Sequence, residues 1–205
     1  MPYAGASALE HNFMSGTLGG MGWLILLIVV AVAALWAVSL YNGLVRHKNL
    51  VAEAWAGIEA QLKRRADLIP NLVATVKGYA AHERETFDEL ARLRAAGQVQ
   101  GDLQTRAQTE TAIGAAIGRV LAVAEGYPEL KASANFQSLQ TELADIEDQI
   151  QLARRYYNGS VRDYNVMVAQ FPSNLVARLG SFAPAQYFEI DNAADRTAPT
   201  VALAG

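Results

Sequence analysis

The sequence predicts an all-α protein in which an N-terminal transmembrane helix precedes an up-and-down bundle of four long antiparallel helices. Residues 21–40 are apolar and uncharged, later apolar side chains recur every three or four positions, and no run alternates in the way typical of strands. We therefore expect five segments: a flexible N-terminus over 1–20, a span over 21–40, a bundle over 41–171, a membrane-proximal interfacial segment over 172–188 and a flexible tail over 189–205.

The run over 21–40 reads MGWLILLIVVAVAALWAVSL. At about 1.5 Å per residue, a helix of this length covers roughly 30 Å, the thickness of a bilayer's hydrocarbon core. Aromatic side chains near both ends suit the membrane interface: Trp23 at one end, and Trp36 and Tyr41 at the other. The residues before the run include no Lys or Arg, unlike the start of a cleaved signal peptide. The run is therefore interpreted as a retained membrane span.

Positive charge follows the span and is absent before it. All 17 Lys and Arg residues come after the span, beginning with Arg46 and Lys48. Because cationic flanks are retained in the cytoplasm, we expect the N-terminus outside, the bundle in the cytoplasm, and these two side chains near lipid headgroups. The 20 Asp and Glu residues nearly balance the 17 cations, which argues against nucleic acid as a partner. The chain has no cysteine, so no disulfide or lipoprotein anchor is expected.

Helix breakers divide the chain after the span into four predicted helices. The first continues from the span to Leu68, and we expect a tight reversal at Pro70, because proline lacks the amide donor and disfavours helical geometry at the residue before it. The other three are predicted from Leu72 to the residue before Gly97, from Asp102 to Glu125, and from Ser133 to Phe171. Short connections make consecutive helices antiparallel neighbours.

The fourth predicted helix has the most regular apolar periodicity and is longer than the first soluble helix. It should therefore regain the level of Tyr41 before it ends, so that Phe171 approaches the membrane surface. The short turn that follows carries Leu175, Arg178 and Leu179, a composition suited to the membrane interface. The alternative is that these residues cover the open end of the bundle.

One cation, Arg65, occupies an apolar stripe of the first soluble helix. If the turns at Pro70 and Pro128 lie at the same membrane-distal end, Arg65 lies near Glu125 and Glu129. A buried ion pair between Arg65 and Glu125 would then fix the register of the bundle. The alternative is that the guanidinium reaches water from a short helix end.

The sequence offers few groupings that carry chemistry. His82, Glu83 and Glu85 suggest a metal site, but on a helix His82 has only Glu85 on its own face, so a solvated surface is the better interpretation. No spacing suggests a Ser-His-Asp or Cys-His arrangement, and no glycine-rich phosphate loop follows a strand. We therefore predict no catalytic residue, cofactor or metal, and expect that the protein is not an enzyme.

Four long stretches resemble the LemA family of bacterial membrane proteins. They are YNGLVRHKNLVAEAW, QLKRRADLIPNLVATVKGYAAHE, AEGYPELKASANFQSLQTEL and ARRYYNGSVRDYNVMVAQFPSNLVA, and the resemblance extends from the span to about Phe188. It implies a single span in the bacterial cell membrane, a short outer N-terminus and a cytoplasmic helical bundle. It implies no reaction and no catalytic residue.

These observations favour a non-enzymatic, membrane-anchored scaffold or adaptor of the LemA type. We expect the lipid bilayer, further copies of the chain and other membrane proteins as partners. The span supports self-assembly because it contains small residues that allow close helix approach, namely Ala31, Ala33, Ala34 and Ala37. The competing hypothesis is a metal-dependent or ligand-sensing accessory subunit of a membrane enzyme, with a small molecule held between the helices.

Overall fold

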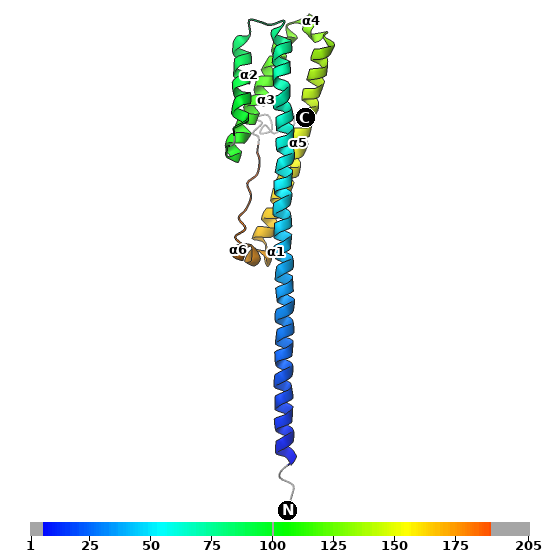
Figure 1. Ribbon diagram of the computed structural model, residues 1–205, viewed down its shortest axis with the longest axis vertical. Helices are drawn as coiled ribbons and strands as arrows, with labels where there is room; N and C mark the ends of the chain where they lie inside the picture. The colour runs from blue at the N-terminus through cyan, green and yellow to red at the C-terminus, as the bar shows by residue number, and fades with distance from the viewer. Residues whose placement is uncertain (1–5, 100, 190–205) are drawn as a thin grey trace, which may run out of the picture. The chain divides into compact units, whose positions relative to one another are not determined.

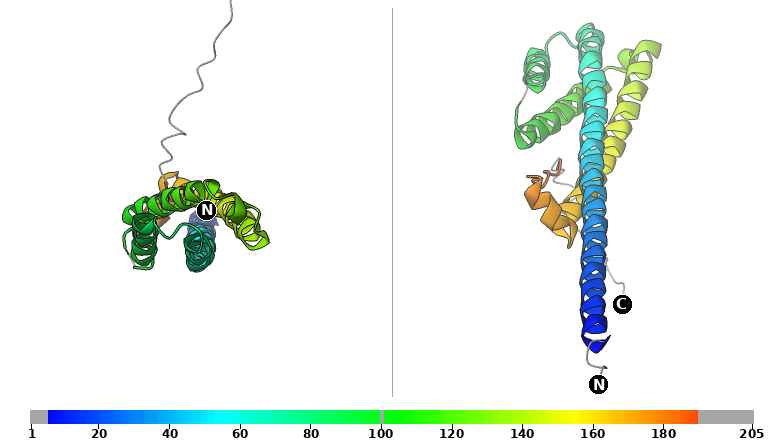
Figure 2. Two further views of the ribbon diagram at one scale, coloured as in Figure 1. Left: turned by 90° about the horizontal axis from the view of Figure 1, so that it is seen from above. Right: turned by 60° about the horizontal axis from the view of Figure 1, so that its bottom comes forward.

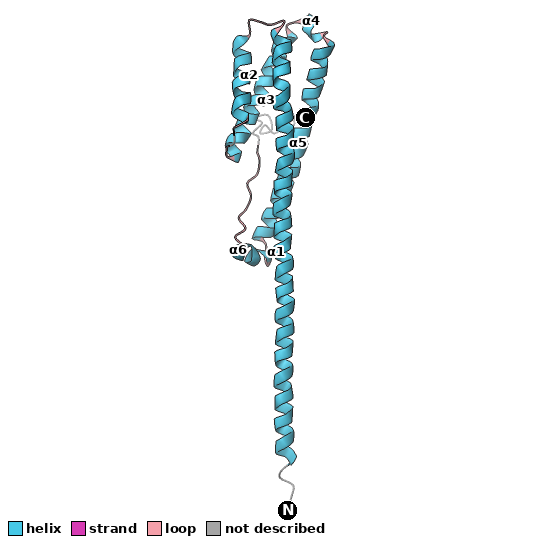
Figure 3. Cartoon of the chain, in the orientation of Figure 1, coloured by secondary structure: helices cyan, strands magenta, loops and turns pink. Residues whose placement is uncertain are grey.

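The computed structural model describes residues 6–99 and 101–189, with side chains from residue 22 onward. In this part of the chain all regular structure is helical, as predicted (Figure 3). The helices are α1 (Ala6–Lys77), α2 (Arg84–Gly97), α3 (Leu103–Glu125), α4 (Pro128–Lys131), α5 (Ala134–Ala169) and α6 (Ser173–Leu179), labelled in Figure 1.

Helix α1 contains both the apolar run and the first helix of the bundle in 72 residues. It begins at Ala6 and so includes most of the N-terminal segment 1–20; elongating an existing helix costs less than nucleating one. Among the described residues, Gly22–Lys77 is the one helix long and apolar enough to cross a membrane. Its most apolar stretch contains no buried residue.

The predicted reversal at Pro70 is wrong, because α1 continues through this proline to Lys77. A proline cannot donate to the carbonyl four residues earlier, which here belongs to Ala66. Arg94 of α2 replaces the missing donor, since its Nε atom lies 2.6 Å from the Ala66 carbonyl oxygen. Ile69, directly before the proline, is fully buried in the core. These tertiary contacts offset the local cost of proline and move the reversal to residues 78–83.

The chain forms two compact units. The stem unit comprises residues up to His47 together with Val166–Ala183, and the bundle unit comprises Lys48–Asn165 together with the described residues from Pro184 onward. The bundle unit is therefore narrower than the predicted range 41–171. Each unit contains part of α1 and part of α5, because both helices cross the boundary between units.

In the bundle unit, α1, α2, α3 and α5 lie side by side and alternate in direction, which confirms the up-and-down order (Figure 1). Viewed from above, α3 lies between α2 and α5 (Figure 2). Two clusters of buried side chains form the core. One includes Ile69, Val76, Phe87, Val120 and Phe136, and the other includes Ile58, Leu62, Ile146, Ile150 and Val161.

A strap, residues 184–188, packs on the bundle unit after α6. Asn165 and Asn158 of α5 each donate to and accept from the strap backbone, at Ala185 and Phe188 respectively, over distances of 2.8–3.1 Å. The Phe188 side chain is fully buried. The expected membrane-proximal segment 172–188 is thus divided between the units: residues 172–183 belong to the stem unit and the strap belongs to the bundle unit. Of the predicted tail 189–205, all but Glu189 lies outside the described residues.

The aromatic cluster beneath the strap centres on Trp55. Its ring centroid lies 5.2 Å from that of Phe188 and 5.5 Å from that of Tyr157, both in edge-to-face geometry. The Tyr157 hydroxyl donates to the Gln186 carbonyl at 2.9 Å. Burial raises the pKa of the Tyr157 phenol above its ordinary value.

Candidate functional site

Arg65 of α1 lies at the centre of a buried ionic network in the bundle unit. Its Nη2 atom donates to the Glu110 carboxylate at 2.7 Å and to the Glu110 carbonyl oxygen at 3.1 Å, while Nη1 donates to the Glu147 carboxylate at 2.9 Å. Glu110 also accepts from Arg106 Nε at 3.1 Å. The side chains of Arg65 and Glu110 are each 4% exposed, whereas Glu147 is 47% exposed. The network thus joins α1, α3 and α5 and reaches the surface at one carboxylate.

The predicted partner, Glu125, is not the one that Arg65 contacts. Because α1 runs on to Lys77, Arg65 lies twelve residues before the end of its helix, a distance of about 18 Å. At this depth it meets Glu110 and Glu147, while Glu125 is exposed at the end of α3. The alternative in which the guanidinium reaches water also fails, since the side chain is almost completely buried.

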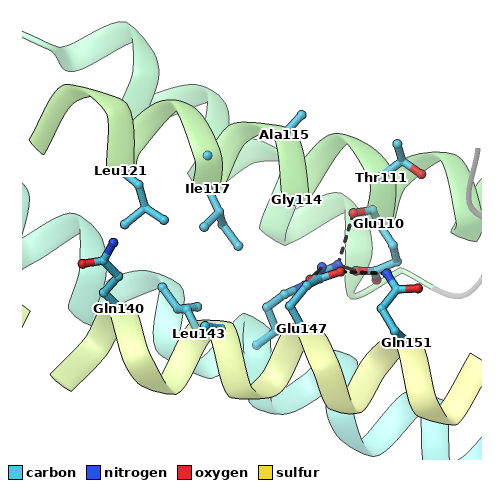
Figure 4. A pocket seen from close by; sticks show the side chains of 13 residues that line it. Glu110, Thr111, Gly114, Ala115, Ile117, Leu121, Gln140, Leu143, Glu147 and Gln151 are labelled. Carbon is cyan, nitrogen blue, oxygen red and sulfur yellow. Dashed lines mark hydrogen bonds and ion pairs between the residues drawn. The ribbon is translucent and has the colours of Figure 1, made fainter. Parts of the chain in front are cut away.

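A groove between α3 and α5 begins at this network, is open to solvent on one side and has a volume of about 490 Å³ (Figure 4). One end contains Arg65, Glu147 and Gln151, and the other, mainly apolar end contains Ile117, Leu121 and Leu143 together with the amide of Gln140. In Figure 4, Ile117 and Leu121 of α3 point across the groove toward α5. This combination of one apolar wall and a few convergent polar groups is typical of small-molecule sites, which occupy roughly 300–1,000 Å³.

Two glycines of α3 keep the groove open. A Cβ atom on Gly114 would lie 3.8 Å from Arg65 Nη1, and a Cβ atom on Gly118 would meet no atom within 4 Å. Four residues apart on a helix, the two positions share one face. Larger side chains there would occupy the groove, which makes Gly118 a suitable position for filling it without an immediate clash.

The residues considered for a metal site do not share a helix face. His82 and Glu83 lie in the turn after α1, Glu85 lies in the first turn of α2, and all three are exposed. Within residues 22–99 and 101–189, no group of three His, Asp or Glu side chains has an arrangement that could hold a metal ion.

The candidate membrane-interface residues lie on the surface of their units. The exposed fractions are 69% for Trp23, 54% for Trp36 and 46% for Tyr41 on α1, and 51% for Leu175 and 88% for Leu179 on α6. Arg46, Lys48 and Arg178 are exposed as well. The structure brings the two helices together at Tyr41, whose ring lies 5.4 Å from that of Phe182 after α6.

An uncovered apolar helix that continues into a helical bundle defines a class of membrane-anchored all-α proteins. A family model described as the LemA family matches residues 54–203, which is most of the chain. The protein therefore belongs to the LemA family, as its resemblance predicted.

Curated relatives agree with this assignment. Magnetosome protein MamQ 2 of Paramagnetospirillum magneticum is 26% identical over 200 residues, covering 84% of this chain and 74% of the relative. Magnetosome protein MamQ of Magnetospirillum gryphiswaldense is 25% identical over 181 residues, covering 76% of this chain and 66% of the relative. Protein LemA of Metamycoplasma hominis is 28% identical over 138 residues, covering 67% of this chain and 63% of the relative. None of these names describes a reaction.

Proposed function

We propose that this protein is a non-enzymatic scaffold or adaptor of the LemA type, anchored in a membrane by α1 and assembled with further copies of itself. The observation that carries the proposal is the double use of α1. Over residues 22–40 the apolar surface of α1 is uncovered. Nearer its C-terminal end, α1 supplies Ile58, Ile69 and Val76 to the buried core. The anchor and the bundle therefore share one continuous helix.

Self-assembly is supported by the surface of the span. Ala33 and Ala37 are four residues apart, so they lie on one helix face and leave room for close backbone approach. Leu35 lies about 160° around the helix from Ala33 and is 72% exposed. A helix pair formed through the alanine face leaves Leu35 toward lipid.

The absence of natural cysteine makes a cross-linking test direct. Single substitutions Ala33→Cys and Leu35→Cys are introduced into the full chain, and disulfide formation is measured in native membranes. We expect covalent dimers at position 33 and several-fold fewer at position 35. Replacing both alanines, Ala33→Ile with Ala37→Ile, should reduce association, whereas Val32→Ile should not. Absence of cross-links at both positions, with light scattering that gives 22.1 kDa after subtraction of the detergent, would contradict self-assembly.

The groove between α3 and α5 favours a second candidate, a ligand-sensing accessory subunit of a membrane enzyme. Its volume of about 490 Å³ and its buried Arg65 network suit a small molecule. Mass spectrometry of the purified protein under native conditions tests this function. A retained molecule that Gly118→Leu removes would support sensing, provided that Gly57→Leu, at an equally open glycine outside the groove, retains it. Metal analysis of the same sample tests the metal-dependent version.

A further inference from the structure

The end of α5 and helix α6 pack on α1 directly after its apolar run. Leu44 of α1 and Ala177 of α6 are buried in the stem unit, with exposed fractions of 0% and 1%. Glycines lie where the segments approach most closely. A Cβ atom on Gly43 would lie 3.0 Å from Met167 Cε, and one on Gly180 would lie 3.2 Å from Tyr41 Cε2. The helix α6 is therefore held within one turn of the last residues of the span.

Backbone and side-chain hydrogen bonds fix both ends of α6. The Ser173 hydroxyl is within hydrogen-bond distance of the carbonyl oxygens of Met167 and Gln170, at 2.6 and 3.0 Å. At the other end, Ser181 adopts a positive φ of 55°, and the Phe182 amide donates to the Ala177 carbonyl at 2.9 Å. This pattern closes the helix as a Schellman motif and directs Phe182 onto Tyr41.

The outer surface of this segment is apolar, although none of the described residues of the stem unit covers it. Leu175 and Leu179, four residues apart, share one face of α6 and are 51% and 88% exposed, while Phe171 is 78% exposed. Val166–Ala183 contains no Asp or Glu, and its single cation is Arg178, which is exposed. Exposed large side chains at this density mark an interaction surface rather than an ordinary solvated one.

The position of this surface identifies its partner. Tyr41 directly follows the run over 21–40 that fills the hydrocarbon core, and each helical residue adds about 1.5 Å. A segment that packs on Tyr41 and Gly43 therefore lies at headgroup depth, where amphipathic helices bury apolar side chains by roughly 5–10 Å. A single Arg without acidic neighbours complements an anionic surface.

We infer that Phe171, Leu175 and Leu179 insert into the leaflet at the C-terminal end of the span, with Arg178 at the headgroups of anionic lipids. This inference rests on the membrane span of the proposed function. The chain thus has a second membrane contact, supplied by residues more than 120 positions after the span. A second copy covering the same face is the competing occupant.

Environment-sensitive fluorophores on single cysteines test this contact in the full chain. The labelled positions are Leu179→Cys and, as a matched control, Leu152→Cys, an exposed leucine on α5 in the bundle unit. The protein is reconstituted into vesicles of phosphatidylcholine and phosphatidylglycerol that contain a lipid-attached quencher. We expect a blue-shifted emission and strong quenching at position 179, and several-fold less quenching at position 152.

The labelling results distinguish a wrong interfacial contact from a wrong membrane span. A blue shift at position 179 without lipid quenching means that another copy covers the face and overturns the inference, as does emission typical of water. A third label at Leu35→Cys reports on the span itself. Quenching at position 35 but not at 179 refutes only the interfacial contact, whereas loss of both refutes the span. Arg178→Gln should weaken quenching at position 179 in vesicles with phosphatidylglycerol and leave it unchanged in pure phosphatidylcholine.

Discussion

Arg65 is a cation within an apolar stripe, and its burial links three helices through Glu110 and Glu147. Two arginines and two glutamates balance their charges in this network once Arg106 is included. Because taking ions from water is costly, we expect this network to contribute to the register of the helices more than to net stability. Helix α3 can slide along α1 only by breaking these bonds.

Replacing Arg65 should destabilise the protein, because it leaves a buried carboxylate with one ionic partner fewer. Arg65→Met retains the length of the side chain but leaves the buried Glu110 carboxylate with Arg106 as its remaining ionic partner. We expect the free energy of unfolding to fall by about 3–5 kcal/mol, measured by chemical denaturation of the full chain in detergent. The adjacent Arg64 is exposed and donates to Gln61 at 3.3 Å, so Arg64→Met should change stability by less than about 0.5 kcal/mol. Equal effects of the two substitutions would contradict this role.

Pro70 and Arg94 form a second coupled pair of residues, although they do not bond to each other. Arg94→Met removes the donor to the Ala66 carbonyl and should cost about 1–3 kcal/mol. Pro70→Ala restores a backbone amide that can donate to the same carbonyl, so the cost of Arg94→Met should shrink in that background. A double-mutant cycle in denaturant measures the coupling. Additive effects would show that Arg94 stabilises the protein in some other way.

At the scale of elements, the strap matches the spacing of α5. Asn158 and Asn165 are seven residues apart, which is about 10.5 Å along a helix. Their partners, Phe188 and Ala185, are three residues apart, which is about 10 Å in an extended chain. The two side-chain amides on α5 are therefore spaced like the two strap residues that they contact. Each amide forms two hydrogen bonds with the strap backbone.

Removing the strap's aromatic anchor should destabilise the bundle unit. Phe188→Ala leaves a cavity beside Trp55 and should lower the free energy of unfolding by about 3–5 kcal/mol. Replacing Trp23 and Trp36 by phenylalanine leaves Trp55 as the sole tryptophan, whose emission should shift to the red in the Phe188→Ala variant. Tyr187→Ala is the matched control, because that side chain is 46% exposed. An unshifted emission with unchanged stability would mean that the strap does not pack on Trp55.

At the scale of the whole molecule, the charge pattern predicts a cytoplasmic bundle. Intact cells expressing single-cysteine variants are treated with a membrane-impermeant thiol reagent. Ala8→Cys should be labelled and Gln98→Cys, at the exposed end of α2, should be labelled only after the cells are opened. The reverse pattern would place the bundle outside.

Features set by neighbouring residues were predictable from the sequence. The span, the all-α class and the order of the long helices follow from apolar composition and a period of three to four residues, which act within one helix. The composition of α6, with large apolar residues and one arginine after a proline, is equally local. These features hold because a helix satisfies its own backbone, wherever the rest of the chain lies.

Tertiary structure decided the features that depend on distant partners. Arg94, which supplies the missing donor beside Pro70, is 28 residues from its acceptor Ala66 in the sequence. The carboxylates that Arg65 contacts are 45 and 82 residues away. The strap bonds to asparagines 20 and 30 residues earlier. At Pro70 the carbonyl that loses its backbone donor accepts from Arg94 instead, and the helix continues. Moving the reversal eight residues along α1 changes which residues of neighbouring helices face one another. Local propensity therefore identified the helices, while long-range hydrogen bonds decided where α1 ends and which charges meet.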